Sequence, residues 1–290
     1  MITYFQAIVI GLLQGVTELF PISSLGHSVL VPALLGWDSL VQGQSADESF
    51  YLAFLVGLHV ATGIALLIFF RADWNRVIRG FGRTLRDRRI EPEDADARMA
   101  WLLIVGTVPV GVVGLVFEHS LRTVFAKPTA AAAFLMINGV ILLAGEQVRK
   151  RSDAHVKSGR PPRRSLSTFT ALDGLLVGGS EILALFAGIS RSGVTIVAGL
   201  LRGLTHEDAA RFSFMLATPV ILAAGLYKLP DLIGPNGNDV RGQVLVGSIA
   251  SGLAAYVSVR FLVRWFTTRT LTPFGIYSLA FGAFCLVRFW

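Results

Sequence analysis

The sequence contains few charged residues and almost no cysteine. Asp, Glu, Lys and Arg make up only 16% of the 290 residues, hydrophobic residues make up 53%, and the mean hydropathy is +0.63. Soluble domains carry about 25% charged residues, so the composition excludes a soluble domain and indicates an integral membrane protein. The single cysteine, Cys285, excludes both an internal disulfide framework and a pair of thiol ligands for a metal.

The hydrophobic residues occur in long continuous runs rather than in short alternating segments. Runs of about 20 apolar residues match a membrane-spanning helix, whereas the strands of a membrane barrel alternate over about 10 residues. The sequence therefore predicts an all-α polytopic membrane protein. Six transmembrane helices are expected, at 51–70, 101–117, 129–147, 212–229, 244–263 and 272–289.

Lys and Arg gather in two segments between these spans, 71–98 and 148–168. Because basic residues concentrate in short cytoplasmic loops, both segments are predicted to be cytoplasmic loops. The segments 37–50, 118–128 and 230–243 are then expected outside. Attraction of the basic loops to anionic membrane lipids accounts for the net charge of +7, so membrane lipids rather than nucleic acid are the expected partners.

Two further apolar segments, 4–36 and 169–203, are interrupted by polar residues. Non-helical backbone at membrane depth is tolerated only where protein or a water-filled cavity surrounds it, so each segment is predicted to be a re-entrant helical hairpin. In the first, Pro21 cannot continue a helix, and half-helices are expected at roughly 4–20 and 25–36. The second breaks at Ala187 to Gly193.

The order of these elements predicts an internal repeat within a single membrane domain, 1–290. A hairpin and three spans form repeat one, 1–147, and the same order recurs in repeat two, 169–290. Since three is an odd number of spans, the two repeats must have inverted topologies. Interrupted helices at corresponding places of inverted repeats are typical of transporters with a site at the midplane. A polyprenyl-phosphate transporter or flippase is therefore one candidate function.

The second break has the composition of an anion site. Hydroxyls and one guanidinium precede a helix expected to begin near Gly193, and a helix N-terminus attracts anions. A guanidinium suits bidentate contact with phosphate. The predicted phosphate-binding residues are Ser190, Arg191, Ser192, Gly193 and Thr195. A structural alternative has Ser192 and Thr195 capping the helix and Arg191 paired with Glu18 or Glu181, and the role of Glu181 stays open.

The first break carries groups suited to catalysis. Glu18 lies four residues after Gln14, on the same face of a half-helix, and Ser23, Ser24 and His27 follow the elbow. A carboxylate, a hydroxyl and an imidazole are the parts of a nucleophilic or acid–base site. Set against the phosphate site of the second break, they predict phosphoryl transfer on a lipid-borne substrate.

Three polar residues elsewhere are expected to have ordinary roles. His59, alone in a span, is interpreted as a structural buried histidine. His206 is expected to be solvated near a helix end, and Glu146 to pair with Arg149 or Lys150.

The two breaks resemble the signatures of a known family. Residues 14–27, QGVTELFPISSLGH, are similar to the first signature of the undecaprenyl-diphosphate phosphatases of the bacitracin-resistance family, and residues 188–195, GISRSGVT, to the second. The resemblance extends over nearly the whole chain. This sequence departs from the family pattern at Ala187, where the family usually has Pro, and at Glu181, where it commonly has Gln.

The resemblance implies a membrane enzyme that hydrolyses undecaprenyl diphosphate, a polyprenyl diphosphate lipid, to undecaprenyl phosphate and so recycles the carrier lipid for cell-wall synthesis. It implies a multi-pass protein of the bacterial plasma membrane, with its active site open to the outer face, and a divalent cation, Mg²⁺ or Ca²⁺. A homodimer is compatible with the sequence, which carries no feature that requires one. A membrane phosphatase of the acid-phosphatase type is disfavoured, because no histidine follows Arg191 before His206.

The roles expected for individual residues follow from both lines of reasoning. Glu18 is the expected base or metal ligand, with Gln14 completing the metal shell, and Arg191 stabilises the transferring phosphoryl group. Ser24, His27 and water stay open as the nucleophile. The predicted catalytic residues are Glu18, Ser24, His27 and Arg191, and the predicted substrate-binding residues are Gln14, Ser23, Gly26, Ser190, Arg191, Ser192, Gly193 and Thr195.

Overall fold

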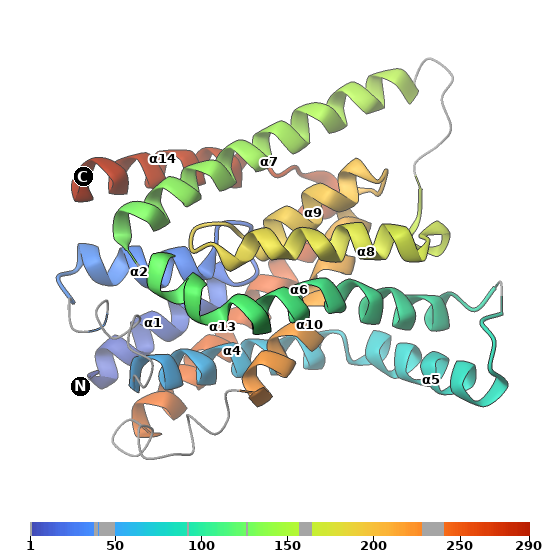
Figure 1. The fold of residues 1–290 in the computed structure, drawn as a ribbon, viewed down its shortest axis with the longest axis horizontal. Coiled ribbons are helices and arrows are strands. Elements are labelled where there is room, and N and C mark those ends of the chain that lie inside the picture. The colour runs from blue at the N-terminus through green and yellow to red at the C-terminus, as the bar shows by residue number, and fades with distance from the viewer. Residues whose placement is uncertain are drawn as a thin grey trace.

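The computed structural model describes residues 2–37, 40, 50–91, 93–125, 127–156, 164–227 and 241–290, and every regular element in these residues is helical (Figure 1). The α-helices are α1 (Tyr4–Thr17), α2 (Ser24–Leu34), α4 (Phe50–Phe69), α5 (Arg71–Asp87), α6 (Ala95–Phe125), α7 (Pro128–Val156), α8 (Ala171–Gly179), α9 (Arg191–Leu201), α10 (His206–Tyr227), α13 (Arg241–Thr268) and α14 (Thr272–Phe289). Two 3₁₀ turns, Leu166–Thr168 and Ser180–Leu185, flank α8.

Several of these helices are long and apolar enough to cross a membrane. Among the described residues five meet this condition, namely α6, α7, α10, α13 and α14, and α4 makes a sixth if it is counted together with α5. The shorter apolar helices α1, α2 and α9 belong to the two interrupted segments. The predicted all-α, multi-pass membrane architecture is therefore confirmed.

The basic segment 71–98, predicted as a loop, contains a helix instead. α5 bends by 83° from the preceding part of α4 and packs beside the start of α6. It buries Val77, Gly80 and Thr84, which recur at helical spacing, and leaves its arginines exposed. Arg83 donates two hydrogen bonds of 2.8 Å to Asp94 in the turn before α6, and these bonds hold the pKa of the Asp94 carboxyl below its usual range.

The segment 118–128, predicted as an outside loop, is also largely helical. α6 continues to Phe125 and α7 begins at Pro128, a position where proline fits because the first helical residue needs no amide donor. Most of 37–50 and 230–243, and residues 157–163 of the basic segment 148–168, lie outside the described residues.

The two interrupted segments pack against long helices from the opposite half of the chain. α1 lies along α13, and α8 lies along α6 (Figure 1). The contacts are between backbones: a Cβ atom on Gly11 would lie 2.3 Å from the carbonyl oxygen of Gly247, and one on Gly178 would lie 2.1 Å from that of Gly106. Small residues allow membrane helices to approach this closely, so each half of the chain fixes the position of the other half's hairpin.

At the end of the bundle near the α13–α14 turn, Glu146 joins three elements. Its carboxylate is hydrogen-bonded to the imidazole of His206 and accepts a 3.2 Å bond from the backbone N–H of Leu271. Lys150, one of the two predicted partners, lies close enough to Glu146 for an electrostatic interaction, and His206 is not simply solvated. Glu146 reaches Leu271 because α7 packs along α14.

Candidate active site

The elbows of the two interrupted segments meet at backbone distance. Ser23, which has a left-handed φ of 69°, accepts a hydrogen bond of 3.2 Å from Gly26 N–H and another of 3.2 Å from Gly188 N–H. A Cβ atom on Gly26 would lie 2.9 Å from the Cα of Gly188. Ser23 and Gly26, predicted as substrate-binding residues, thus join the two elbows to each other.

A residue that sequence reasoning missed also joins the elbows. Asn138, fully buried in α7, donates a 3.0 Å hydrogen bond to the carbonyl of Pro21 and accepts one of 3.0 Å from the N–H of Ser190. An amide at the middle of the apolar span 129–147 is the signal that could have identified it, because a polar side chain at membrane depth needs a partner.

Each elbow ends in a serine that caps the following helix. Ser23 accepts from Gly26 N–H before α2, and Ser190 accepts from Gly193 N–H before α9, both at 3.2 Å. Serine is a favoured N-cap because its hydroxyl satisfies an unpaired amide of the first turn. The first residues of the two capped helices are Ser24 and Arg191, which occupy corresponding positions.

Both of these residues bind one carboxylate. Glu18 follows the last residue of α1 and is only 7% exposed. Arg191 Nη2 donates to its Oε1 at 2.6 Å, Ser24 Oγ donates to its Oε2 at 2.5 Å, and Gln14 Nε2 donates to the same Oε2 at 2.9 Å. The structure therefore brings together four residues, from both breaks, that the sequence assigned to the site.

His27 was predicted to lie in the site and His59 outside it, but the structure places His59 beside Glu18 and His27 away from it. His59 Nε2 lies 3.5 Å from Glu18 Oε2, and its side chain lines the same cavity. His27 is 1% exposed, with Nδ1 at 2.7 Å from the carbonyl of Ser23 and Nε2 at 2.8 Å from the hydroxyl of Tyr277. His59 is therefore neither alone in its span nor fully buried, contrary to what the sequence had suggested. His27 turns away because α2 presents it toward α14 rather than toward Glu18.

The hydroxyls of the second break differ in where they point. Ser190 lines the cavity, and its Oγ lies 3.0 Å from that of Ser192. Ser192 Oγ donates to the carbonyl of Phe20 at 3.3 Å, and Thr195 Oγ1 lies 2.6 Å from Ser213 Oγ. The predicted binding roles of Ser192, Gly193 and Thr195 are thus not supported by their side-chain or amide contacts, since these groups already have partners within the protein.

Beside Glu18 lies a cavity of about 600 Å³. Its polar lining includes Glu18, Ser24, His59, Glu181 and Arg191. Apolar side chains of α4, α6 and α10 form much of the remaining lining, among them Val56, Val110, Leu115, Val220 and Ile221. A cavity with charged groups together with a hydrocarbon lining suits an amphiphile whose polar head reaches Glu18.

Several buried polar atoms at this site have no hydrogen-bond partner in the described part of the chain: Gln14 Oε1, both carboxylate oxygens of Glu181, and Arg191 Nη1. Glu181 is only 1% exposed. Leaving such groups unsatisfied costs about 1–3 kcal/mol each, so they are suited to contacts with a ligand. The N–H groups suit an anion, and the oxygens suit a cation or a proton.

A divalent cation fits this donor set in part. Mg²⁺ and Ca²⁺ prefer oxygen ligands, and Mg²⁺ is commonly held by one or two carboxylates together with substrate phosphates. Glu18, Glu181 and Gln14 supply such oxygens. Within the described residues, no group of three or more His, Cys, Asp and Glu side chains forms a site that could hold a metal by itself.

Comparison with known proteins gives one consistent result. The family described as bacitracin resistance protein BacA matches residues 7–284. Undecaprenyl-diphosphatase 2 of Frankia alni is 55% identical, with 99% of this chain and 98% of that protein covered. Undecaprenyl-diphosphatase of Mycolicibacterium paratuberculosis is 55% identical, with coverages of 99% and 97%. Undecaprenyl-diphosphatase 2 of Chromobacterium violaceum is 42% identical, with coverages of 96% and 95%.

Proposed function

This chain belongs to the bacitracin resistance protein family, and from that membership we infer that it is an undecaprenyl-diphosphatase. It hydrolyses undecaprenyl diphosphate to undecaprenyl phosphate and inorganic phosphate, which returns the carrier lipid to cell-wall synthesis. The observation that carries this function is the position of Glu18, held between Ser24 and Arg191 beside a cavity with a largely hydrocarbon lining.

Arg191 binds the diphosphate in this proposal. Its Nη2 is paired with Glu18 while its Nη1 has no partner among the residues that the structure describes, so one guanidinium can contact the carboxylate and a phosphate oxygen together. Phosphoryl transfer depends mainly on positioning and on stabilising the charge of the phosphoryl oxygens. Arg191 supplies both functions, and Ser190, which lines the cavity beside it, adds a hydroxyl.

Ser24 is the nucleophile that the geometry favours over His27. Glu18 accepts the Ser24 proton, Ser24 Oγ forms a bond to the terminal phosphorus, and the bond from that phosphorus to the bridging oxygen breaks. Undecaprenyl phosphate leaves with the bridging oxygen. Glu18 passes the proton from Ser24 to the leaving bridging oxygen and is a carboxylate again. It then takes a proton from the water that attacks phosphoserine and gives that proton to Ser24 Oγ as the bond to phosphorus breaks, which releases inorganic phosphate and regenerates Ser24. The 2.5 Å contact between Ser24 Oγ and Glu18 Oε2 supports this assignment.

Glu18, Glu181 and Gln14 would hold a divalent cation, Mg²⁺ or Ca²⁺, next to the diphosphate. The unpartnered oxygens of Glu181 and Gln14 support this proposal. A bound cation would neutralise part of the charge on the diphosphate. Glu181, whose role the sequence left open, is then a member of the site.

The two halves of the chain form inverted repeats, and the active site opens to the outer face of the plasma membrane. Two observations support the repeats: α2 and α9 are both 11-residue helices capped by serine, and α1 and α8 each pack on a long helix of the other half. The arginine-rich α5 supports the orientation, because basic residues mark the cytoplasmic side.

Release of phosphate by purified protein in detergent micelles tests the function, because transport across a membrane is undefined there. Wild-type protein is expected to release inorganic phosphate from undecaprenyl diphosphate, and Glu18→Gln to lose this activity. Glu207→Gln, an exposed glutamate in the first turn of α10, is the matched control and keeps it. Translocation of undecaprenyl phosphate in proteoliposomes without phosphate release in micelles would instead establish a transporter.

A further inference from the structure

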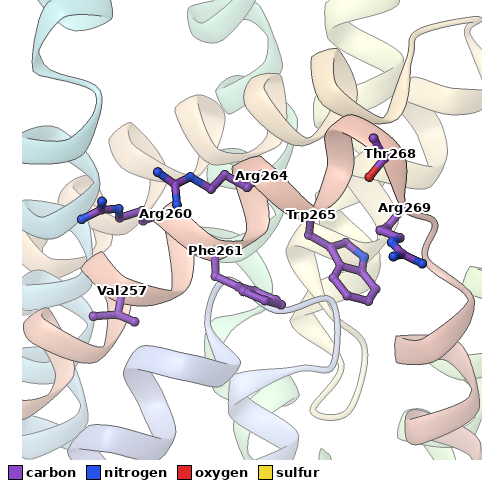
Figure 2. Close-up of a pocket in the computed structure, with 7 residues that line it drawn as sticks. All are labelled: Val257, Arg260, Phe261, Arg264, Trp265, Thr268 and Arg269. Carbon is purple, nitrogen blue, oxygen red and sulfur yellow. The ribbon is translucent and has the colours of Figure 1, made fainter.

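A basic groove lies at the C-terminal end of α13, away from the residues of the active site. Seven residues along the last turns of this helix and just beyond it line a groove of about 530 Å³, as Figure 2 shows: Val257, Arg260, Phe261, Arg264, Trp265, Thr268 and Arg269. Three of the seven are arginines with exposed side chains. The groove therefore combines positive charge with the aromatic rings of Phe261 and Trp265.

Within the described part of the chain, no carboxylate pairs with these arginines. Arg260 and Arg264 have no ion-pair or hydrogen-bond partner for their side chains among the residues that the structure describes, and Arg269 lies over the ring of Trp265 at 5.9 Å. The indole N–H of Trp265 is already bonded to the carbonyl of Thr270. Unpaired guanidinium groups beside a ring face are suited to a phosphate, which accepts several charge-assisted hydrogen bonds from them.

The position of the groove along α13 corresponds to the membrane–water interface. Tyr256, one turn before Arg260, packs edge-to-face on Phe69, the last residue of α4, with ring centroids 5.8 Å apart. The chain bends directly after Phe69 into the arginine-rich α5. The arginines of the groove thus lie at the level where α4 ends, and Trp and basic residues anchor membrane proteins at this interface.

An apolar stripe leads along α13 to the groove. Leu245, Ile249, Leu253 and Val257 recur every fourth residue and are each more than half exposed, with Val257 at 67%. Residues at this spacing share one face of a helix. The acyl chain of a phospholipid can lie along the stripe while the phosphate of the same lipid lies among the arginines. A soluble anion has no acyl chain and would not contact the stripe.

We propose that this groove is a binding site for the phosphate head group of an anionic phospholipid of the surrounding membrane. Charge complementarity and the adjoining apolar stripe select this occupant over a zwitterionic lipid or free phosphate. The groove is also connected to the active site through side-chain contacts. Phe261 stacks on Phe20 with ring centroids 5.8 Å apart, and the Phe20 carbonyl accepts the hydrogen bond from Ser192 at the elbow.

Binding is tested first, without reference to activity, by native mass spectrometry of detergent-solubilised protein with short-chain phosphatidylglycerol. Each basic residue near an anionic lipid contributes about five-fold in affinity, so Arg260→Gln with Arg264→Gln should weaken binding about 25-fold. The matched control is Arg86→Gln with Arg89→Gln, which removes the same charge from exposed positions in and just after α5. Because Arg86 and Arg89 are paired with Asp87 and Glu91, the control should lose much less affinity than the groove variant.

Three outcomes would overturn the proposal: wild-type affinity in the groove variant, equal losses in both variants, or equal binding of phosphatidylcholine and phosphatidylglycerol by the wild type. Inorganic phosphate is added as a competitor. Its displacement of the lipid at equal concentration would show that the groove recognises phosphate alone, which also contradicts the proposed lipid site.

A second measurement, which rests on the proposed phosphatase function, compares phosphate release in nanodiscs of phosphatidylglycerol and of phosphatidylcholine. The wild type is expected to be several-fold faster in phosphatidylglycerol, and the groove variant to lose this difference. If no lipid supports phosphate release, the phosphatase function fails while the binding result stands. If release is normal and the groove variant binds lipid as wild type does, only the groove proposal fails.

Discussion

A single carboxylate, Glu18, contacts a guanidinium from one elbow and a hydroxyl from the other, so each of these side chains can be tested separately. Arg191→Lys keeps a positive charge near Glu18 but removes the planar fork, and we expect kcat to fall about 100-fold or more. Arg191→Ala removes the charge as well and should cost about 10³- to 10⁵-fold, the range found for arginines that stabilise a transferring phosphoryl group. The measurement is steady-state phosphate release.

Arg202→Lys is the control for this substitution, because Arg202 lies at the other end of α9 and pairs with Asp173 at 2.6 Å. It should keep nearly full activity. An Arg191→Ala enzyme within a few-fold of wild type would remove Arg191 from the phosphate site.

Ser24 can be tested as the nucleophile by chemical trapping. A reaction quenched during turnover should contain phosphate on Ser24, detected by peptide mass spectrometry, and Ser24→Ala should show no adduct. We expect kcat of the variant to fall about 10³-fold or more, because removing a nucleophile leaves only binding and electrostatic stabilisation. An adduct on His27 would contradict the assignment, and the absence of any adduct would indicate direct attack by water.

Glu181 can be tested through the cation rather than through activity alone. Glu181→Gln keeps the shape of the side chain but removes the carboxylate charge, so the concentration of Mg²⁺ or Ca²⁺ needed for half-maximal activity should rise about ten-fold or more. A titration after chelation measures this shift, with Glu207→Gln as the control. An unchanged cation requirement would exclude Glu181 as a ligand.

The sequence correctly predicted that Gln14, Glu18, Ser24 and Arg191 are neighbours. Polar groups buried in apolar segments are costly unless they bond to one another, so their clustering could be expected. The sequence could not show which of the two histidines lies nearer to Glu18. Whether His27 or His59 faces Glu18 depends on the rotation of α2 and α4 about their axes, which is set by packing against α14 and α13. Asn138 was missed for a related reason: the groups that it bonds at the two elbows, the Pro21 carbonyl and the Ser190 N–H, belong to the backbone and carry no sequence signature.

At the scale of elements, the contact between the two elbows depends on a glycine. A Cβ atom on Gly26 would lie 2.9 Å from the Cα of Gly188, so Gly26→Ala must separate the elbows. We expect a destabilisation of about 1–3 kcal/mol, as for other overpacked sites, and a loss of activity that exceeds the loss of folded protein. Thermal unfolding and phosphate release measure the two effects.

Gly82→Ala is the matched control, since nothing lies within 4 Å of its added Cβ on α5. This substitution should stabilise the helix by about 0.5–1 kcal/mol and leave activity unchanged. Wild-type activity in Gly26→Ala would show that the elbows need not touch.

The predicted spans 51–70 and 272–289 agree within one residue with α4 and α14, and breaker residues mark the two elbows. Pro21 marked the first elbow, and Gly188, with a φ of 115°, lies at the second. α5 was missed although Trp74, Val77 and Phe81 recur at helical spacing and pack toward the core. The surrounding arginines dominated the pattern and indicated a loop, although they lie on the exposed face of an amphipathic helix.

At the scale of the whole molecule, the two halves are interlocked rather than placed side by side. α1 packs on α13 and α8 packs on α6, so each hairpin is held by the other half. The order of hairpins and spans could be predicted from the sequence. The packing of each hairpin on the other half could not, because a glycine such as Gly11 gives no indication in the sequence that it contacts Gly247. Neither half is therefore expected to form the site without the other.

The orientation of the whole molecule can be tested with thiol labelling. Cys285 is fully buried, so the native chain should react little with a membrane-impermeant maleimide. Leu35→Cys lies at the exposed end of α2 on the proposed outer side, and Arg89→Cys lies just beyond α5 on the proposed cytoplasmic side. In intact cells we expect labelling of Leu35→Cys alone, and labelling of Arg89→Cys only after permeabilisation. The reverse pattern would place the mouth of the site in the cytoplasm, where the enzyme would meet newly made rather than recycled carrier lipid.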